Sequence, residues 1–240
     1  TRGAINAISR DGNSVEEVIS EIASAEPRPP VAWDNAFAEA ARRHTEFQIQ
    51  LGTQTHEGPR GLESVTDRVI AAGYGQPEAV AENIIYGVDS SEHAMRAFLA
   101  DYGPGNSHDP HRENIQQTDP GKKSLQDVGV AVLPVQVPVE VSNPFGSPSA
   151  PKSETKLVVT QVFGRKDQAP PKVLGVVYDD SNNDRFYDVG EGVSNAEVTI
   201  TNRGTGESTT VKTWSSGGYQ AEVAPGLHSI EVRVNDRVIG

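Results

Sequence analysis

A chain of 240 residues with 35% hydrophobic residues is long enough for one or two domains, each with its own core. Its net charge of −12 makes nucleic acid an unfavourable partner, and no apolar run is long enough to predict a transmembrane segment. Because the chain has no cysteine, disulfides, thiol catalysis and zinc–thiolate sites are excluded.

The first hundred residues contain four segments with the apolar spacing of amphipathic helices. These predicted helices cover residues 14–25, 34–49, 61–73 and 92–102. In the second helix, Asp34 is the expected N-cap and Gly52 the expected stop. His44 lies on the apolar stripe of this helix, where a packing role is expected. Between the last two helices, residues 78–87 predict a turn or a short strand.

From Asp127 onward the helical period gives way to alternation of β-branched and polar residues. Residues 127–141 and 156–164 are predicted strands, and residues 142–156, rich in proline and serine, are a predicted exposed loop. The polar, proline-ended segment 165–171 is a predicted linker. Beyond it, glycine and proline turns separate five short predicted strands, at residues 174–178, 196–201, 209–214, 219–223 and 229–234. The pattern predicts an α+β domain at 1–164 and a small all-β sandwich at 172–240.

The run from residue 180 to residue 191 has the ligand spacing of a twelve-residue calcium loop. Oxygen side chains occupy positions 1, 3, 5, 9 and 12, and a backbone carbonyl is available at position 7. The six residues are Asp180, Asn182, Asp184, Phe186, Asp188 and Glu191. We expect calcium to bind here in a structural role; the alternative is an acidic surface turn without metal. Arg185 stands at position 6, where glycine normally makes the sharp turn, and should weaken the site.

Both sides of this loop read as strands, at residues 173–178 and 193–200. A strand, an acidic loop and a second strand in this order resemble the calcium-binding B-type repeats of bacterial surface adhesins. Gly218–Tyr219 followed by Pro225–Gly226–Leu227 is similar to the end of such repeats.

The first domain contains several short motifs in a fixed order. They are Val31–Asp34 with Ala40–His44, Thr55–Gly58, Ala81–Ile84, His111–Ile115, and the strand-like Asp127–Ala131 and Thr160–Gly164. In this order the motifs resemble the CAP superfamily of cysteine-rich secretory, antigen 5 and pathogenesis-related proteins. The resemblance covers roughly residues 5 to 164 and implies an α/β/α sandwich.

The resemblance also implies a cavity that holds two histidines and two carboxylates. His56, Glu82 and His111 match three of the family's residues, and Asp101, three residues after Phe98, takes the place of the second carboxylate. His108 is a rival for the position of His111. Two imidazoles and two carboxylates can bind zinc or another divalent metal, in a loose and exchangeable manner, or act as a general acid and base.

Together the resemblances imply a bacterial protein that is secreted, extracellular or attached to the cell surface. Its first domain is expected to be a non-enzymatic binding module for a lipid, a glycan or a protein of the cell envelope. One alternative is a metal-dependent hydrolase or protease that uses His56 and His111. A second alternative is a structural or adhesive surface protein in which the calcium sandwich acts as a spacer.

Overall fold

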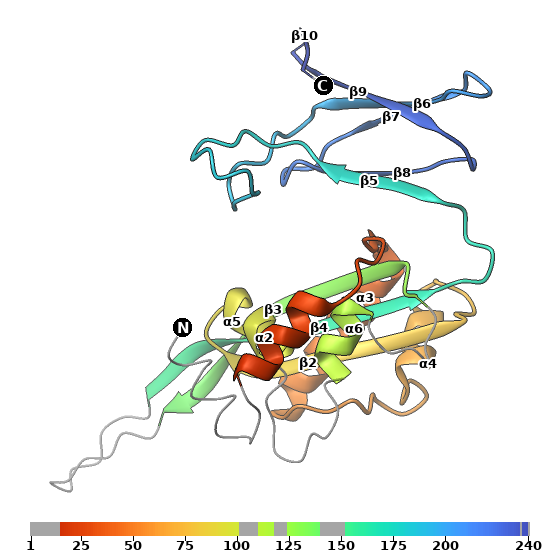
Figure 1. Cartoon of the computed structure of the whole chain (residues 1–240). Coiled ribbons are helices and arrows are strands. Elements are labelled where there is room, and N and C mark those ends of the chain that lie inside the picture. Colours follow the sequence, from red (N-terminus) through yellow and green to blue (C-terminus); the bar gives the residue numbers. More distant parts are fainter. Residues whose placement is uncertain (1–14, 101–109, 118–123, 140–151, 236, 240) are drawn as a thin grey trace, which may run out of the picture. The chain divides into compact units, whose positions relative to one another are not determined.

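The computed structural model describes residues 15–100, 110–117, 124–139, 152–235 and 237–239. The chain divides into two compact units, Thr1–Asp167 and Gln168–Gly240. The first unit combines helices with a sheet, and the described residues of the second unit form strands (Figure 1). The predicted α+β class is therefore confirmed.

A four-stranded sheet forms the centre of the first unit. In spatial order its strands are β1 (Ala32–Trp33), β3 (Asp127–Val139), β4 (Lys152–Arg165) and β2 (Ala79–Val88). β1 runs parallel to β3, and the other pairs are antiparallel. Glu82 on β2 is opposite Val162 on β4, so the glutamate lies on an edge strand of the sheet.

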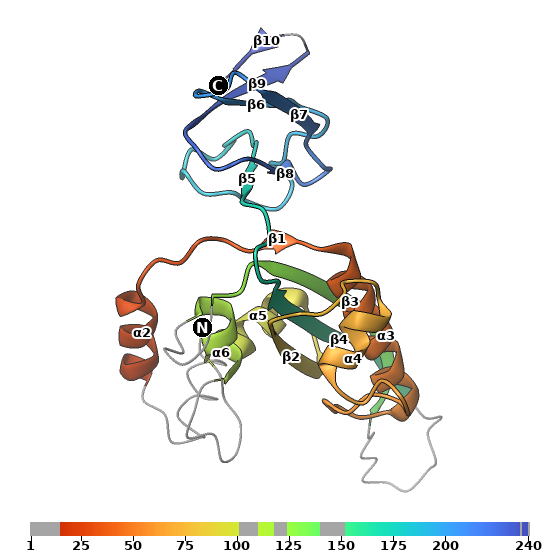
Figure 2. The same ribbon diagram turned by 90° about the vertical axis from the view of Figure 1, so that its right-hand side faces the viewer.

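Helices cover both faces of this sheet and give three layers (Figure 2). One face carries α3 (Asn35–Leu51) and α4 (Val65–Ala71), and the other carries α2 (Val15–Ser24), α5 (Ser91–Ala100) and α6 (Pro110–Gln116). Neighbouring residues of a strand point to opposite faces. Glu82 accordingly contacts α4, whereas the adjacent Asn83 contacts α6.

The ends of α3 follow from its local sequence. The Asp34 carboxylate accepts hydrogen bonds from the N–H groups of Ala36, at 2.8 Å, and Phe37, at 3.1 Å, and caps the first turn. Gly52 adopts φ of 74°, a left-handed conformation that glycine reaches without steric cost, and ends the helix. Both features agree with the sequence-based expectation.

Helix α4 is shorter than the predicted 61–73. It begins after Ser64, because Ser64 and Asp67 form a capping box in which each side chain bonds the other residue's backbone N–H. The residues before Ser64 remain outside the helix, and the backbone carbonyls of Leu62 and Glu63 accept hydrogen bonds from Arg68 instead.

Strand pairing extends the sheet beyond the prediction. Residues 79–88, which overlap the stretch 78–87 predicted as a turn or a short strand, form the ten-residue β2 because nearly every residue of β2 pairs with β4. The predicted loop 142–156 is wrong at its end, since residues 152–156 belong to β4 and pair with β3. Arg165, the first residue of the predicted linker, pairs with Ala79 as the last residue of β4.

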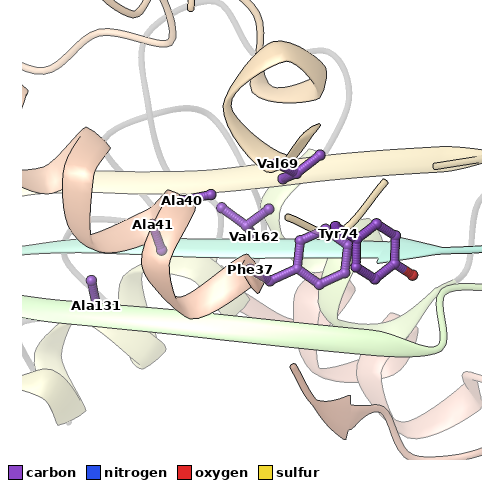
Figure 3. Packing of buried hydrophobic residues seen from close by; sticks show 7 residues of the cluster. All are labelled: Phe37, Ala40, Ala41, Val69, Tyr74, Ala131 and Val162. Carbon is purple, nitrogen blue, oxygen red and sulfur yellow. The ribbon is translucent and has the colours of Figure 1, made fainter. Parts of the chain in front are cut away.

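The main core of the first unit lies between the sheet and the helices α3 and α4 (Figure 3). Its buried members are Phe37, Ala40, Ala41, Val69, Tyr74, Ala131 and Val162. Helix α3 lies so close to the sheet that a Cβ at Gly129 would be 2.0 Å from the backbone nitrogen of Ala38. A Cβ at Gly164 would be 2.5 Å from the ring of Phe37. Two glycines therefore permit the close contact between helix and sheet.

The second unit is a small sandwich of two sheets. The larger sheet has the order β10 (Arg237–Val238), β9 (His228–Val234), β6 (Glu197–Asn202) and β7 (Ser208–Lys212), and the smaller one pairs β5 (Lys172–Val176) with β8 (Gly218–Glu222). Val198 and Ile200 of β6 pack in one buried cluster with Tyr219 and Ala221 of β8. Because these residues are two positions apart in each strand, they point to the same side, and one face of each sheet is buried against the other. β10 is an addition to the five predicted strands.

Candidate functional site

The first candidate site is built around Glu82, which is central in β2. Its side chain is 3% exposed, and its Oε1 lies 2.9 Å from the Nδ1 of His56, whose side chain is 61% exposed. A carboxylate only accepts hydrogen bonds, so Nδ1 of His56 donates and Nε2 carries the lone pair of the neutral ring. The sequence-predicted residues His56 and Glu82 are therefore in direct contact.

Arg68 fixes Glu82 from the other side. Its Nη2 donates to Oε2 of Glu82 at 2.7 Å, and both side chains are buried. The Nη1 of Arg68 lies 3.2 Å from the backbone carbonyl of His56 and 2.9 Å from that of Glu63. One guanidinium therefore connects α4, β2 and the loop that carries His56. Gly58 in that loop has no room for a side chain, since a Cβ would be 2.0 Å from the carbonyl oxygen of Leu62.

These contacts set the charge of the site. Burial by itself would raise the pKa of Glu82, but the hydrogen bond from His56 and the positive charge of Arg68 outweigh it and hold the pKa below its ordinary value. Glu82 is therefore ionised at neutral pH. A buried ion pair of this kind fixes the position of its neighbours, because loss of either partner would leave the other charge buried without compensation.

A second histidine lies behind Glu82. His44 on α3 is buried, and its Nε2 lies 2.8 Å from the backbone carbonyl of Thr55 and 3.8 Å from Oε1 of Glu82. Burial lowers the pKa of His44, so the ring is neutral at pH 7. The sequence predicts a packing role for His44 and does not single out Arg68. The sequence signal for Arg68 is its position as a basic residue on the apolar stripe that Val65 and Val69 form.

His111 makes its contacts on the face of the sheet that carries α5 and α6, opposite to the face on which Glu82 contacts Arg68. Its backbone carbonyl accepts a hydrogen bond from Nδ2 of Asn83 at 3.1 Å, and its ring lies against the ring of Phe98 with centroids 5.3 Å apart. Asn83 also bonds Gln161 and Asn114 through buried hydrogen bonds, which hold α6 against β2. The Glu82–Asn83 pair thus links two different faces of the sheet.

The other two residues expected in the cavity, Asp101 and the alternative histidine His108, lie outside the described residues. Within the described ranges, no group of three or more His, Cys, Asp or Glu side chains is placed to hold a metal ion. A surface pocket of about 390 Å³ lies between α2 and α6. Its lining is largely charged and polar: Glu21, Ser24, Glu26, Arg28, Arg112, Glu113 and Gln116.

The second candidate site is the loop from Asp180 to Glu191, between β5 and β6. An isolated bridge between Tyr178 and Gly192 closes its ends. The Glu191 carboxylate accepts hydrogen bonds from the N–H of Ser181 at 3.1 Å and from the N–H of Asp188 at 3.0 Å. The bond from Asp188 in particular lowers the pKa of Glu191 below its ordinary value, so the last predicted ligand is ionised.

The first half of the loop folds around the Asp180 carboxylate, which accepts from the N–H of Asp184 at 3.1 Å and from the N–H of Arg185 at 3.0 Å. The Nδ2 of Asn182 donates to Asp184 at 3.1 Å and to Asp188 at 2.7 Å. A positively polarised amide group therefore lies between two carboxylates.

Two further predicted features of the loop can be located. Arg185 has φ of 67°, the left-handed conformation that position 6 requires and that a side chain adopts at a cost. The N–H of Phe186, the residue expected to supply a carbonyl ligand, donates to Asp184 at 2.8 Å.

Comparisons with known proteins show limited similarity. No family model matches the chain. A segment of 134 aligned residues is 32% identical to Colossin-A of Dictyostelium discoideum; the alignment covers 50% of this chain and 1% of Colossin-A. The structure is similar to an extracellular protein containing an SCP domain from Bacillus anthracis, with 22% identity and a TM-score of 0.39, over 57% of this chain and 34% of that one. In the described part of the chain, no helix has the length and apolar character needed to cross a membrane.

Proposed function

We propose that the first unit is a secreted CAP-type binding module that acts without catalysis on a lipid, glycan or protein of the cell envelope. The observation that carries the proposal is the exposed His56 ring held by the buried Glu82 carboxylate. An imidazole fixed in this way presents its Nε2 atom to solvent in one orientation, which suits recognition of a ligand or a metal ion.

Two features favour binding over catalysis. The hydrogen bond from His56 and the positive charge of Arg68 hold the pKa of Glu82 low, so the carboxylate orients His56 and does not exchange protons near neutral pH. Among the described residues, the hydrogen bonds of the His56 ring include no hydroxyl group that could serve as a nucleophile. The alternative, a hydrolase, requires such a group or an activated water beside the ring.

A divalent metal such as zinc is the proposed partner of His56 Nε2. A metal-binding histidine usually donates its other ring N–H to a carboxylate, which is the contact that His56 makes with Glu82. His111, the second ligand expected from the sequence, makes its described contacts with Asn83 and Phe98 on the other face of the sheet, so the proposal rests on His56. Because a single histidine leaves most coordination positions open, the metal would exchange with solvent and with bound ligands.

Zinc titration of the full chain by calorimetry tests this site. His56→Ala should lower zinc affinity at least about tenfold. His93→Ala, which removes an exposed histidine on α5, should leave it unchanged. Equal affinity in the wild type and His56→Ala would refute the metal site. Metal-dependent turnover of ester or peptide substrates that disappears in both His56→Ala and His111→Ala would replace the binding function with the hydrolase.

For the second unit we propose structural calcium binding in the 180–191 loop. The support is the ligand spacing, the ionised Glu191 and the amide group of Asn182 between two carboxylates. Calcium would replace the internal hydrogen bonds among these groups and brace the connection between β5 and β6.

Scanning calorimetry with calcium and with a chelator tests this proposal. Calcium should raise the unfolding temperature of the second unit and leave that of the first unit unchanged. Glu191→Gln should abolish the increase, and Glu222→Gln, a change of an exposed glutamate on β8, should retain it. Identical transitions with calcium and chelator would show that the loop is an acidic turn without metal.

A further inference from the structure

A small cavity of about 30 Å³ lies beside the buried residues of the first site. Helix α3, helix α4 and the loop between them line it, with Ala40, Pro59, Leu62 and Ala71 as its apolar wall. Arg43, His44 and Arg68 complete the lining. A space of this size accommodates one or two water molecules, provided that polar groups are present to bind them.

Two of the lining residues, His44 and Arg68, supply such polar groups. Among the described residues, Nδ1 of His44 and Nε of Arg68 are buried and have no hydrogen-bond partner. Their other nitrogens are engaged: Nε2 of His44 with the carbonyl of Thr55, and Nη2 of Arg68 with Glu82. Buried polar atoms in folded proteins nearly always have a partner, so two such atoms beside one cavity indicate a bound molecule.

The hydrogen-bonding roles of the two atoms define its chemistry. The Thr55 carbonyl can only accept, so Nε2 of His44 carries the hydrogen, and Nδ1 of the neutral ring is an acceptor. The Nε of Arg68 is always a donor. The bound molecule must therefore donate one hydrogen bond and accept another. A halide or a fully ionised anion cannot donate, whereas water does both.

We propose that this cavity is a binding site for an internal water molecule that donates to Nδ1 of His44 and accepts from Nε–H of Arg68. The water connects α3 to α4 directly behind Glu82. With it, each guanidinium nitrogen of Arg68 has a partner: the loop carbonyls for Nη1, Glu82 for Nη2 and water for Nε. The orientation of the Glu82–His56 pair then depends on a solvent molecule as well as on side chains.

Nitrogen-15 NMR of the full wild-type chain tests the proposal without a substitution that could disturb folding. The Arg68 Hε proton should exchange with bulk solvent about 100-fold more slowly than the Arg42 Hε proton and should show a cross-peak to a long-lived water. Arg42 is the control because its Nε donates to Glu39 on the exposed surface and the residue does not line the cavity. The His44 nitrogens should report a protonated Nε2 and an unprotonated, hydrogen-bonded Nδ1.

Three results would overturn the proposal. A slowly exchanging Hε without a water cross-peak would mean a dry cavity. A change in the Arg68 Nε signal on addition of sodium chloride or phosphate would mean an anion in place of water. A protonated Nδ1 at pH 7 would remove the acceptor. A crystal structure with density within hydrogen-bonding distance of both nitrogens, unchanged across salt conditions, would support the water independently.

Discussion

The Nδ1 atom of exposed His56 lies 2.9 Å from Oε1 of buried Glu82, so a solvent-facing ring is anchored on a charge inside the protein. The anchor is stable because Arg68 neutralises that charge and holds the loop of His56 by its backbone. The site therefore combines a buried ion pair with the exposed ring of His56. Its stability and its pH dependence both follow from this arrangement.

Glu82→Gln should destabilise the first unit by about 3–5 kcal/mol, because it leaves the buried Arg68 without a counter-charge. His56→Gln, which changes only the exposed partner, should cost at most about 1 kcal/mol. Denaturant unfolding followed by the fluorescence of Trp33 measures both, in a Trp214→Phe background that removes the other tryptophan. A loss for Glu82→Gln no larger than for His56→Gln would contradict the buried ion pair.

Acid should destabilise the first unit in two steps. The folded state lowers the pKa of His44 below its ordinary value of 6.5, so below pH 6.5 the unfolded chain binds a proton that the folded chain does not, and stability falls. The lowered pKa of Glu82 adds a second loss below its ordinary value of 4.5. Both terms stabilise the fold at higher pH.

The first of these steps can be isolated with His44→Gln. This variant should show a smaller change in unfolding free energy between pH 7 and pH 5.5 than the wild type, measured by the fluorescence of Trp33. The step below pH 4.5 should remain. If the two proteins lose stability in parallel between pH 7 and pH 5.5, His44 is not the titrating group.

Gly129→Ala should destabilise the first unit by about 1–3 kcal/mol or more, because its Cβ would overlap the backbone of α3 at Phe37 and Ala38. The matched control is Gly61→Ala, which adds the same methyl group where nothing lies within 4 Å and pays only for a φ of 83°. Thermal unfolding by circular dichroism compares the two. Equal losses would mean that α3 can move away from the sheet freely.

Arg185→Gly should stabilise the second unit by about 0.5–1 kcal/mol, since glycine adopts φ of 67° without steric strain. Calcium affinity should increase as well, because the change also removes a positive charge from the loop. Arg185→Ala separates the two effects: it removes the charge and keeps the strained backbone. Calorimetric melting and calcium titration are the measurements. If Arg185→Gly is less stable than Arg185→Ala, backbone strain at this position is not the cause.

Thr213→Val should destabilise the second unit by about 1–3 kcal/mol. The buried Thr213 hydroxyl donates to the carbonyl of Val193 at 2.6 Å and accepts from the N–H of Ala196 at 2.9 Å, and valine has nearly the same shape without either bond. Thr199→Val, at a hydroxyl pair with Thr210 on the exposed face, should be nearly neutral. Similar effects of the two substitutions in denaturant unfolding would show that the Thr213 bonds are replaced by solvent.

Features that depend on neighbouring residues agree with their prediction from the sequence. The N-cap at Asp34 and the stop at Gly52 depend on one turn of backbone, so they follow from local sequence. Strand β2 was harder, because residues 79–88 become a full strand through pairing with β4 and their own pattern is ambiguous. Helix α4 is shorter than predicted, because the residues before Ser64 form a turn whose carbonyls accept hydrogen bonds from Arg68.

The sequence by itself determined the α+β class, the caps of α3 and the ligand spacing between Asp180 and Glu191, because each depends on composition or on residues close together in the chain. The tertiary structure brings His56 into contact with Glu82, 26 residues away, as the family resemblance implied, and it alone decided that Arg68 and His44 lie behind them. The physical reason is burial: Glu82 can remain charged inside the protein only where a distant arginine neutralises it, and local sequence does not specify which arginine that is.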